Sequence, residues 1–302
     1  MSTQWQVSLF DRLTAAVHSD GGWRYIAGTA PCAEPTSLAC LALAAGGMET
    51  EAWKRGMAWL AQRQRPDGSV PVASNVTSPC WTTGLAVLAW SAPIGETAVH
   101  YRPQIEKAAH WLLHARGKPV APNPRVYGHD TTLEGWSWVE NTHAWVEPTA
   151  YAILALIAAG EAEHLRVREG LQLLLDRAIP GGGWNYGNTR VFTNTLRPFP
   201  SPTGIALTAL GGEPPDSRID SGIAYLISVL QRVRAPLSLS WGLMGLSAWG
   251  KRPDESPQWL EECARRVLRS APNAMYDALL LLADADHCPI THRSLEVATT
   301  HG

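Results

Sequence analysis

The chain has 302 residues and a formal net charge of −2, and only 17% of its residues are charged. Because Lys and Arg form no run, we expect no nucleic-acid partner. Five cysteines without a C-x-x-C pair argue against a disulfide framework and a zinc ribbon, so we expect a reducing, cytoplasmic compartment. The aromatic composition is unusual, because 14 tryptophans outnumber the 7 tyrosines and 3 phenylalanines together.

A short apolar pattern recurs along the chain and predicts six helices of one kind. Its clear copies begin at Glu34, Trp81, Glu147 and Ser201, and weaker copies begin at Trp241 and Asp277. These segments carry almost no charge, and a helix that is apolar all round must be buried on all sides. Each copy follows an amphipathic segment with apolar residues at helical spacing, such as Ile219, Ile223, Leu226, Ile227 and Leu230.

The alternation of amphipathic and apolar helices predicts an all-α fold. Six outer and inner helix pairs fit an (α/α)6 toroid whose inner helices surround a central cavity. We expect one domain over residues 1–284 and a C-terminal tail over residues 285–302. Long connections over residues 19–33, 64–78, 117–145 and 178–200 precede the first four inner helices, so we expect them all at one end of the barrel. Long loops inside a compact domain are usually functional.

A family resemblance rests on the loops and on the inner helices. The stretch of residues 55–70, RGMAWLAQRQRPDGSV, resembles the QW repeat of squalene and oxidosqualene cyclases, with Val70 in the place of the tryptophan. Together with inner helices of the form T-x-x-A-x-L-x-L, it makes the chain similar to the superfamily of terpenoid cyclases and protein prenyltransferases. The resemblance extends over residues 5–284 and implies the α/α-toroid fold.

The resemblance also implies candidate catalytic carboxyls. Class II triterpene cyclases place an aspartic acid two residues before Thr-Ala, where it protonates an alkene or an epoxide. Glu147 stands at that position here, and Glu34 stands in a second copy of the motif. With Asp277, they should meet at one mouth of the barrel, where desolvation raises carboxyl pKa values and makes a general acid. Favourable interaction with the helix dipole is the alternative role.

The surplus of tryptophan suggests a binding wall at the same end. Outer-to-inner loops or inner-helix starts hold the candidate substrate-binding residues, which are Trp81, Trp136, Trp138, Trp145, Trp184, Trp241 and His143. Tryptophan faces stabilise carbocations by cation–π attraction, although loop tryptophans of this family also clamp neighbouring helix pairs. We expect no metal, because the zinc ligands of prenyltransferases are not recognisable, but Cys32, Cys80 and His143 leave a metal cluster open.

These observations favour a terpenoid cyclase-like enzyme that acts on an isoprenoid or another apolar substrate without a cofactor. One alternative is a non-catalytic toroid that binds an isoprenoid or a lipid, or that docks to a partner. A second alternative is a carbohydrate-active (α/α)6 enzyme, whose carboxyls would lie roughly 5–9.5 Å apart. Full class II cyclases build their cavity between two barrels, so a homodimer or a second subunit would supply the missing wall. Peripheral contact with a membrane also stays open.

Overall fold

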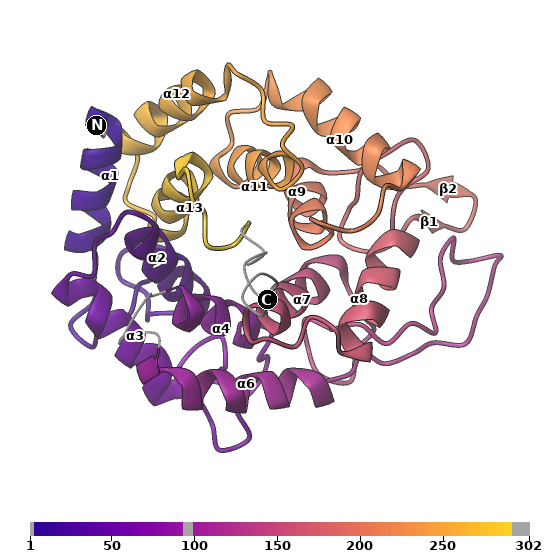
Figure 1. Cartoon of the computed structure of the whole chain (residues 1–302), viewed down its shortest axis with the longest axis horizontal. Coiled ribbons are helices and arrows are strands. Elements are labelled where there is room, and N and C mark those ends of the chain that lie inside the picture. The colour runs from indigo at the N-terminus through magenta and orange to yellow at the C-terminus, as the bar shows by residue number, and fades with distance from the viewer. Residues whose placement is uncertain (1–2, 93–98, 292–302) are drawn as a thin grey trace, which may run out of the picture.

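Twelve α-helices form two concentric rings in the computed structural model, which describes residues 3–92 and 99–291 (Figure 1). The inner ring comprises α2 (Ala33–Ala45), α4 (Thr83–Ser91), α7 (Val146–Ala158), α9 (Pro200–Ala209), α11 (Pro236–Ser247) and α13 (Ala274–Asp284). The outer ring comprises α1 (Gln4–Ala15), α3 (Glu51–Arg63), α6 (Arg102–His114), α8 (Leu165–Asp176), α10 (Ser217–Leu230) and α12 (Ser256–Leu268). The predicted (α/α)6 arrangement is confirmed.

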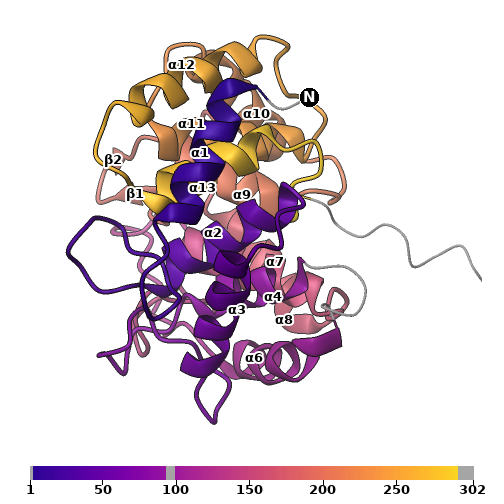
Figure 2. The same cartoon turned by 90° about the vertical axis from the view of Figure 1, so that its left-hand side faces the viewer.

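The inner helices close into a ring. Each contacts the next inner helix along the chain, and α13 contacts α2. Where the first and last units meet, α1 packs over α13 (Figure 2). Small residues allow close approach, since a Cβ atom added to Gly204 would lie 2.1 Å from the Trp241 carbonyl oxygen. Within the described residues, no helix combines the length and the apolar character that a membrane span requires.

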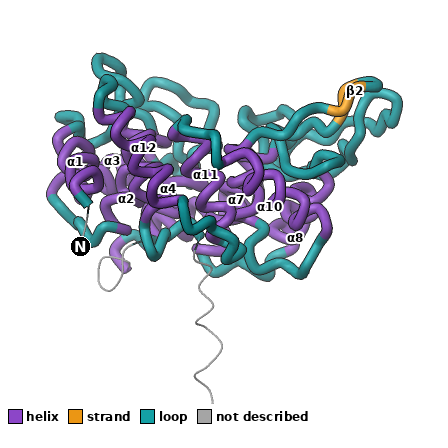
Figure 3. The backbone as a smooth tube through the Cα atoms, turned by 90° about the horizontal axis from the view of Figure 1, so that it is seen from above, coloured by secondary structure: helices purple, strands orange, loops and turns teal. Residues whose placement is uncertain are grey.

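The long connections gather at one end of the ring, as predicted (Figure 3). This end, called the mouth below, is where the inner helices begin, and it carries the hairpin of β1 (Arg190–Val191) and β2 (Asn194–Thr195). The short connections from inner to outer helices lie at the opposite end. Loops from different units therefore share one surface.

Three details differ from the sequence-based expectations or extend them. Helix α11 begins at Pro236, so Trp241 lies in its second turn and not at its start. On α10, Ile227 is exposed, although the other four residues of its predicted apolar stripe are buried on the side where α10 packs against α9 and α11. After α13, Cys288 and Ile290 are buried, so the chain packs against the barrel beyond its last helix.

Tryptophans in three mouth loops clamp outer helices to inner ones. The clamp residues are Trp23, Trp136 and Trp184. Their backbone N–H groups donate to threonine Oγ1 atoms of inner helices, on Thr36, Thr149 and Thr203. Their indole Nε1 atoms donate over 2.6–2.9 Å to carbonyls near the ends of outer helices, on Leu13, Leu112 and Leu174. In the second unit, Val70 stands in the place of the tryptophan. Its backbone N–H donates to Thr83 Oγ1, but a valine has no indole N–H to make the second bond.

Each clamp also needs a glycine on the following outer helix. The ring edges lie against Gly56, Gly170 and Gly222, where an added Cβ would come within 2.4–2.9 Å of the indole Cζ3 atom. A Cβ–carbon distance below 3.0 Å requires that something shift, and the indole is held at both ends by hydrogen bonds. The sequence pattern of one tryptophan per loop and one glycine per outer helix therefore encodes the joint between units.

Gly222→Ala tests this joint. In an unconstrained helix the change would stabilise the protein by up to ~1 kcal/mol, but overpacking against Trp184 should destabilise it by ~1–3 kcal/mol. The measurement is urea unfolding, with the exposed neighbour Ser221→Ala as the control. In a Trp184→Leu background the penalty of Gly222→Ala should disappear. A stabilising Gly222→Ala would contradict the clamp.

Candidate functional site

Two glutamates occupy equivalent positions at the mouth. Glu34 lies in the first turn of α2, and Glu147 lies in the first turn of α7. Helix α4 contacts both α2 and α7, so the two carboxyls flank the start of α4. Both side chains are largely buried but keep some accessible surface. A ligand that enters the mouth could therefore reach them.

A tyrosine makes the two glutamates unequal. The Tyr25 hydroxyl, on the loop between α1 and α2, donates a hydrogen bond to Glu34 Oε2. Burial raises the pKa of Glu34, whereas the bond from Tyr25 lowers it. Burial and the adjacent Glu34 charge raise the pKa of Tyr25, so the phenol keeps its proton. The net effect is a raised pKa of Glu34, but the bond from Tyr25 favours its ionised form in part.

Glu147 is the member that keeps its proton. Burial, and then the negative charge of Glu34, raise the pKa of Glu147 to about 8. Like charges that share an apolar site cannot both ionise freely, and the group without a donor stays neutral. Within the described residues, no hydrogen bond to the Glu147 carboxyl offsets its burial. At pH 7 this side chain is therefore mainly a neutral carboxylic acid, which can donate a proton.

A row of aromatic rings extends from this carboxyl pair. Tyr151 lies one helical turn beyond Glu147 on the same face of α7, and its pKa is raised by burial and by the neighbouring carboxyls. Its ring centroid lies 6.0 Å from that of Trp81 and 5.8 Å from that of Trp241. Trp138 contacts Trp81 edge to face at 4.7 Å. Trp81, Trp138 and Trp241, three of the predicted binding residues, are therefore brought together around Tyr151.

Other predicted residues lie elsewhere. Both carboxylate oxygens of Asp277 accept hydrogen bonds from Arg12, which also donates to the Val267 carbonyl, so Asp277 faces the outer helices α1 and α12. This ion pair closes the seam between the first and last units, which corrects the prediction of a catalytic role for Asp277. Trp184 is a fully buried clamp and no substrate contact.

Three further predicted residues lie at the margin of the row. Trp136 is also a clamp, although it borders a cavity described below. Trp145 and His143 contact one another at a ring distance of 4.4 Å, and Trp145 packs against Gly187. His143 is exposed. Trp145 and His143 thus pair with each other beside the fourth mouth loop.

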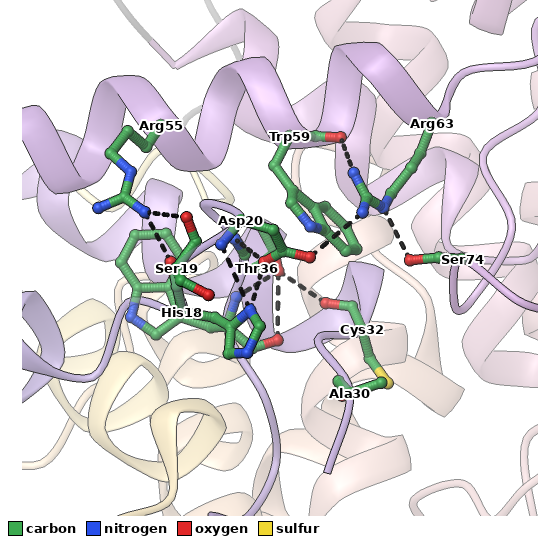
Figure 4. Close-up of polar contacts among 12 residues, drawn as sticks. His18, Ser19, Asp20, Ala30, Cys32, Thr36, Arg55, Trp59, Arg63 and Ser74 are labelled. Atoms are coloured by element: carbon green, nitrogen blue, oxygen red, sulfur yellow. Dashed lines mark hydrogen bonds and ion pairs between the residues drawn. The ribbon is translucent and has the colours of Figure 1, made fainter. Parts of the chain in front are cut away.

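The loop that carries Tyr25 is fastened to the second unit (Figure 4). Asp20 accepts a hydrogen bond from His18 at 2.6 Å, and its other carboxylate oxygen lies 3.4 Å from Arg63 on α3. Arg63 in turn donates to Ser74 at 3.0 Å. These contacts join the loop to α3 and, through Arg63, to the second mouth loop. Tyr25 is therefore positioned before any ligand arrives.

Tyr25 escaped the sequence analysis, although a signal for it exists. An aromatic residue stands two positions after each clamp tryptophan, as Tyr25, Trp138 and Tyr186. In extended backbone, residues i and i+2 point to the same side. Tyr25 and Trp138 both reach the site, and Tyr186 is half-exposed on the fourth loop.

A cavity of about 330 Å³ opens next to the row. Its lining includes Trp81, Trp111, Trp136, Glu140 and Pro148, the residue after Glu147. Glu140 accepts a hydrogen bond from Ser78, which joins the second and third mouth loops beside the cavity. The cavity therefore offers an apolar approach to Trp81 from the mouth. In residues 3–92 and 99–291, no group of three or more His, Cys, Asp or Glu side chains could hold a metal ion.

Comparison with known proteins places this geometry in context. No protein-family model matches the chain. Over 162 residues, 51% of this chain, it is 28% identical to squalene–hopene cyclase from Bradyrhizobium diazoefficiens, of which the match covers 23%. A probable squalene–hopene cyclase from Sinorhizobium fredii is 25% identical over the same length. The chain thus spans about a quarter of the length of the curated relatives that it matches.

Solved structures share the architecture at low identity. An α-amylase from Clostridium perfringens superposes with a TM-score of 0.66 at 11% identity, covering 94% of this chain and 98% of that chain. A type II terpene cyclase from Scytonema superposes with a TM-score of 0.57 at 15% identity, covering 89% of this chain and 79% of that one. The chain has the α/α-toroid fold of these structures. This toroid thus shares its fold with terpene cyclases and with glycosidases.

The raised pKa of Glu147 predicts a pH dependence of stability. Between pH 4.5, its ordinary pKa, and about pH 8, the unfolded toroid loses this proton while the folded toroid keeps it. Unfolding then releases a proton, so the free energy of unfolding falls as the pH rises. Glu147→Gln removes this titration. Between pH 5 and pH 8, the free energy of unfolding should therefore fall less in Glu147→Gln than in the wild type, by ~1.4 kcal/mol or more, the value of one pKa unit.

Chemical unfolding at the two pH values measures this effect. The matched control is Glu51→Gln, because Glu51 also lies in the first turn of a helix but is exposed. The control should follow the wild type. If the free energy of unfolding changes with pH by the same amount in Glu147→Gln and in the wild type, Glu147 ionises at its ordinary pKa and the prediction is wrong.

Proposed function

We propose that this toroid is a class II terpene cyclase-like enzyme that protonates a carbon–carbon double bond of an isoprenoid, with Glu147 as the general acid. The observation that carries the proposal is a carboxyl with its pKa raised to about 8, one helical turn from a ring that begins an aromatic row. An effective general acid has a pKa near the working pH. Glycosidase chemistry would instead need polar groups to hold sugar hydroxyls, and the row offers mainly aromatic faces.

Each member of the carboxyl pair has its own part. The Tyr25 hydroxyl favours the Glu34 carboxylate, and burial, aided by the Glu34 charge, keeps the proton on Glu147. Tyr25 and Glu34 are therefore positioning residues, and Glu147 is the group that touches the reacting carbon. The division resembles other sites in which two carboxyls are driven to different pKa values by their surroundings.

Protonation of the substrate by Glu147 starts the proposed reaction. The Glu147 proton forms a C–H bond with one alkene carbon as the π bond breaks, which leaves positive charge on the other carbon. Attack by a second double bond forms a C–C bond and moves the charge along the chain, until a water molecule at the end of the cation takes a proton and restores an alkene. Glu147 regains its proton from solvent, which closes the cycle. The faces of Trp81, Tyr151 and Trp241 attract the cation without bonding to it.

The sequence relatives agree with this assignment, since squalene–hopene cyclases match half of the chain. They are also about four times longer than the matched segment. We therefore propose that a second copy of the chain or a second subunit covers the mouth during the reaction. A covered mouth would keep water from capturing the cation.

Product formation from polyprenyl substrates tests the proposal. Glu147→Gln keeps the shape of the side chain but removes its proton, so it should lower turnover by roughly 100-fold or more. Glu51→Gln should leave turnover unchanged. Isoprenoid binding that survives both Glu147→Gln and Glu34→Gln, with no product from any variant, would favour a non-catalytic binding toroid. Hydrolysis of α-linked glucans that requires both carboxyls would favour the carbohydrate alternative.

The pH profile tests the role of Tyr25. Since Glu147 must be protonated, activity should fall as the pH rises through about 8. Tyr25→Phe removes the donor to Glu34, which raises the pKa of Glu34, lessens its charge and lowers the pKa of Glu147. The falling limb should then move by roughly one pH unit to lower pH. Tyr186→Phe, at the equivalent half-exposed position, is the control. If activity falls at the same pH in Tyr25→Phe as in the wild type, the tyrosine has only a structural role.

A further inference from the structure

A second cavity lies outside the aromatic row, and nothing in the proposed reaction uses it. It has a volume of about 110 Å³ and lies between the third mouth loop, the fourth mouth loop and the end of α8. Basic and amide side chains dominate its polar lining, namely Lys118, His129, His143, Arg177 and Asn188. None of the residues that line it is acidic. The cavity lining therefore carries the cationic groups of Lys118 and Arg177 and no carboxylate, in a protein with net negative charge.

Arg177 forms the buried wall of this cavity. The residue is 4% exposed, and burial lowers its pKa to about 10. Its Nη2 atom donates to the Asp130 carbonyl at 3.1 Å. Its Nε atom is buried without a hydrogen bond in the described residues and lies 3.8 Å from the Asp176 carboxylate. A desolvated guanidinium with a free donor is costly unless an anion completes its partners.

His129 supplies a second unused polar atom. Its Nδ1 atom is buried and has no hydrogen-bond partner among the residues the structure describes. The ring packs against Tyr127 at 5.7 Å, and Tyr127 forms a β-bridge with Val191 of the fourth loop. An added Cβ at Gly128 would lie 2.8 Å from Thr189 Oγ1, so the two loops are in close contact. The cavity is thus framed by two loops that hold each other in place.

The acidic groups near Arg177, Asp130 and Asp176, do not line the cavity, and both accept hydrogen bonds from neighbouring residues. Asp130 Oδ1 accepts hydrogen bonds from the backbone and the hydroxyl of Thr132. Asp176 Oδ2 accepts the Asp130 N–H at 2.9 Å. The Asp176 carboxylate, 3.8 Å from Arg177 Nε, offsets part of the Arg177 charge. Lys118 and His129 line the same cavity as Arg177 and add an ammonium group and an imidazole to it.

We propose that this cavity binds a phosphate-type oxyanion, held by Arg177, His129 and Lys118. A volume of 110 Å³ corresponds to three or four waters at ~30 Å³ each, which suits one tetrahedral group. Arginine forks recognise such oxygens in a bidentate manner, and a lysine adds a point charge. Two sources share this chemistry, namely the phosphorylated end of an isoprenoid and free inorganic phosphate.

Calorimetric titration of the full chain with inorganic phosphate at low salt tests the site. We expect a Kd below ~1 mM. Lys118→Gln and His129→Gln should each weaken binding by about fivefold or more. The matched controls are Lys54→Gln and His100→Gln, which change exposed residues of the same types. Because Lys118 is exposed, its variant should fold, as a thermal melt would verify. Absent binding, or equal losses in the controls, would overturn the proposal.

A second titration, with farnesyl phosphate, distinguishes the two sources of the phosphate. Farnesyl phosphate that binds more tightly than inorganic phosphate, and that loses this advantage in Lys118→Gln, would identify the end of an isoprenoid. Equal affinities would identify free phosphate, and either outcome supports the site. Glu147→Gln should leave phosphate binding unchanged. A failure of the cyclase proposal and a failure of the oxyanion site would therefore be seen separately.

Discussion

Six helices that carry almost no charge must bury every side, and this constraint determines the rest of the molecule. A closed ring with an outer layer satisfies it, because each inner helix is covered by two inner neighbours and by outer helices. The same closure brings the six inner-helix starts together at the mouth. Residues far apart in the chain, such as Glu34 and Glu147, become neighbours for that reason.

Two opposing effects act on an acidic residue at such a helix start. The helix dipole favours the ionised form by ~0.3–1 kcal/mol. Burial favours the neutral form, and the rise of the Glu147 pKa from 4.5 to about 8 spans several units of ~1.4 kcal/mol each. Burial therefore prevails at Glu147, whereas at Glu34 the Tyr25 hydroxyl offsets it in part. The capping interpretation does not account for this asymmetry between two equivalent positions.

Much of this was accessible from the sequence, because periodicity and repeats report burial directly. The recurrent Thr pattern identified six units, and it placed Glu34 and Glu147 at their starts. Asp277 fits the same pattern, but its ion pair with Arg12, 265 residues away in the chain, depends on ring closure that no local pattern shows. Trp184 and Trp81 both precede inner helices in the sequence, but Trp184 is a clamp whereas Trp81 stacks on Tyr151, and only their tertiary partners reveal the difference. The cationic cavity around Arg177 joins two loops and one helix end, and no sequence motif marks it.

The central claim is that Glu147 is a neutral carboxylic acid in the folded toroid. Infrared difference spectroscopy between the wild type and Glu147→Gln observes this proton directly, through the C=O stretch of a protonated carboxyl. The account predicts that this band is present in the wild type at pH 7, is absent from Glu147→Gln, and titrates away near pH 8. A carboxylate band that is already complete at pH 6 would contradict it.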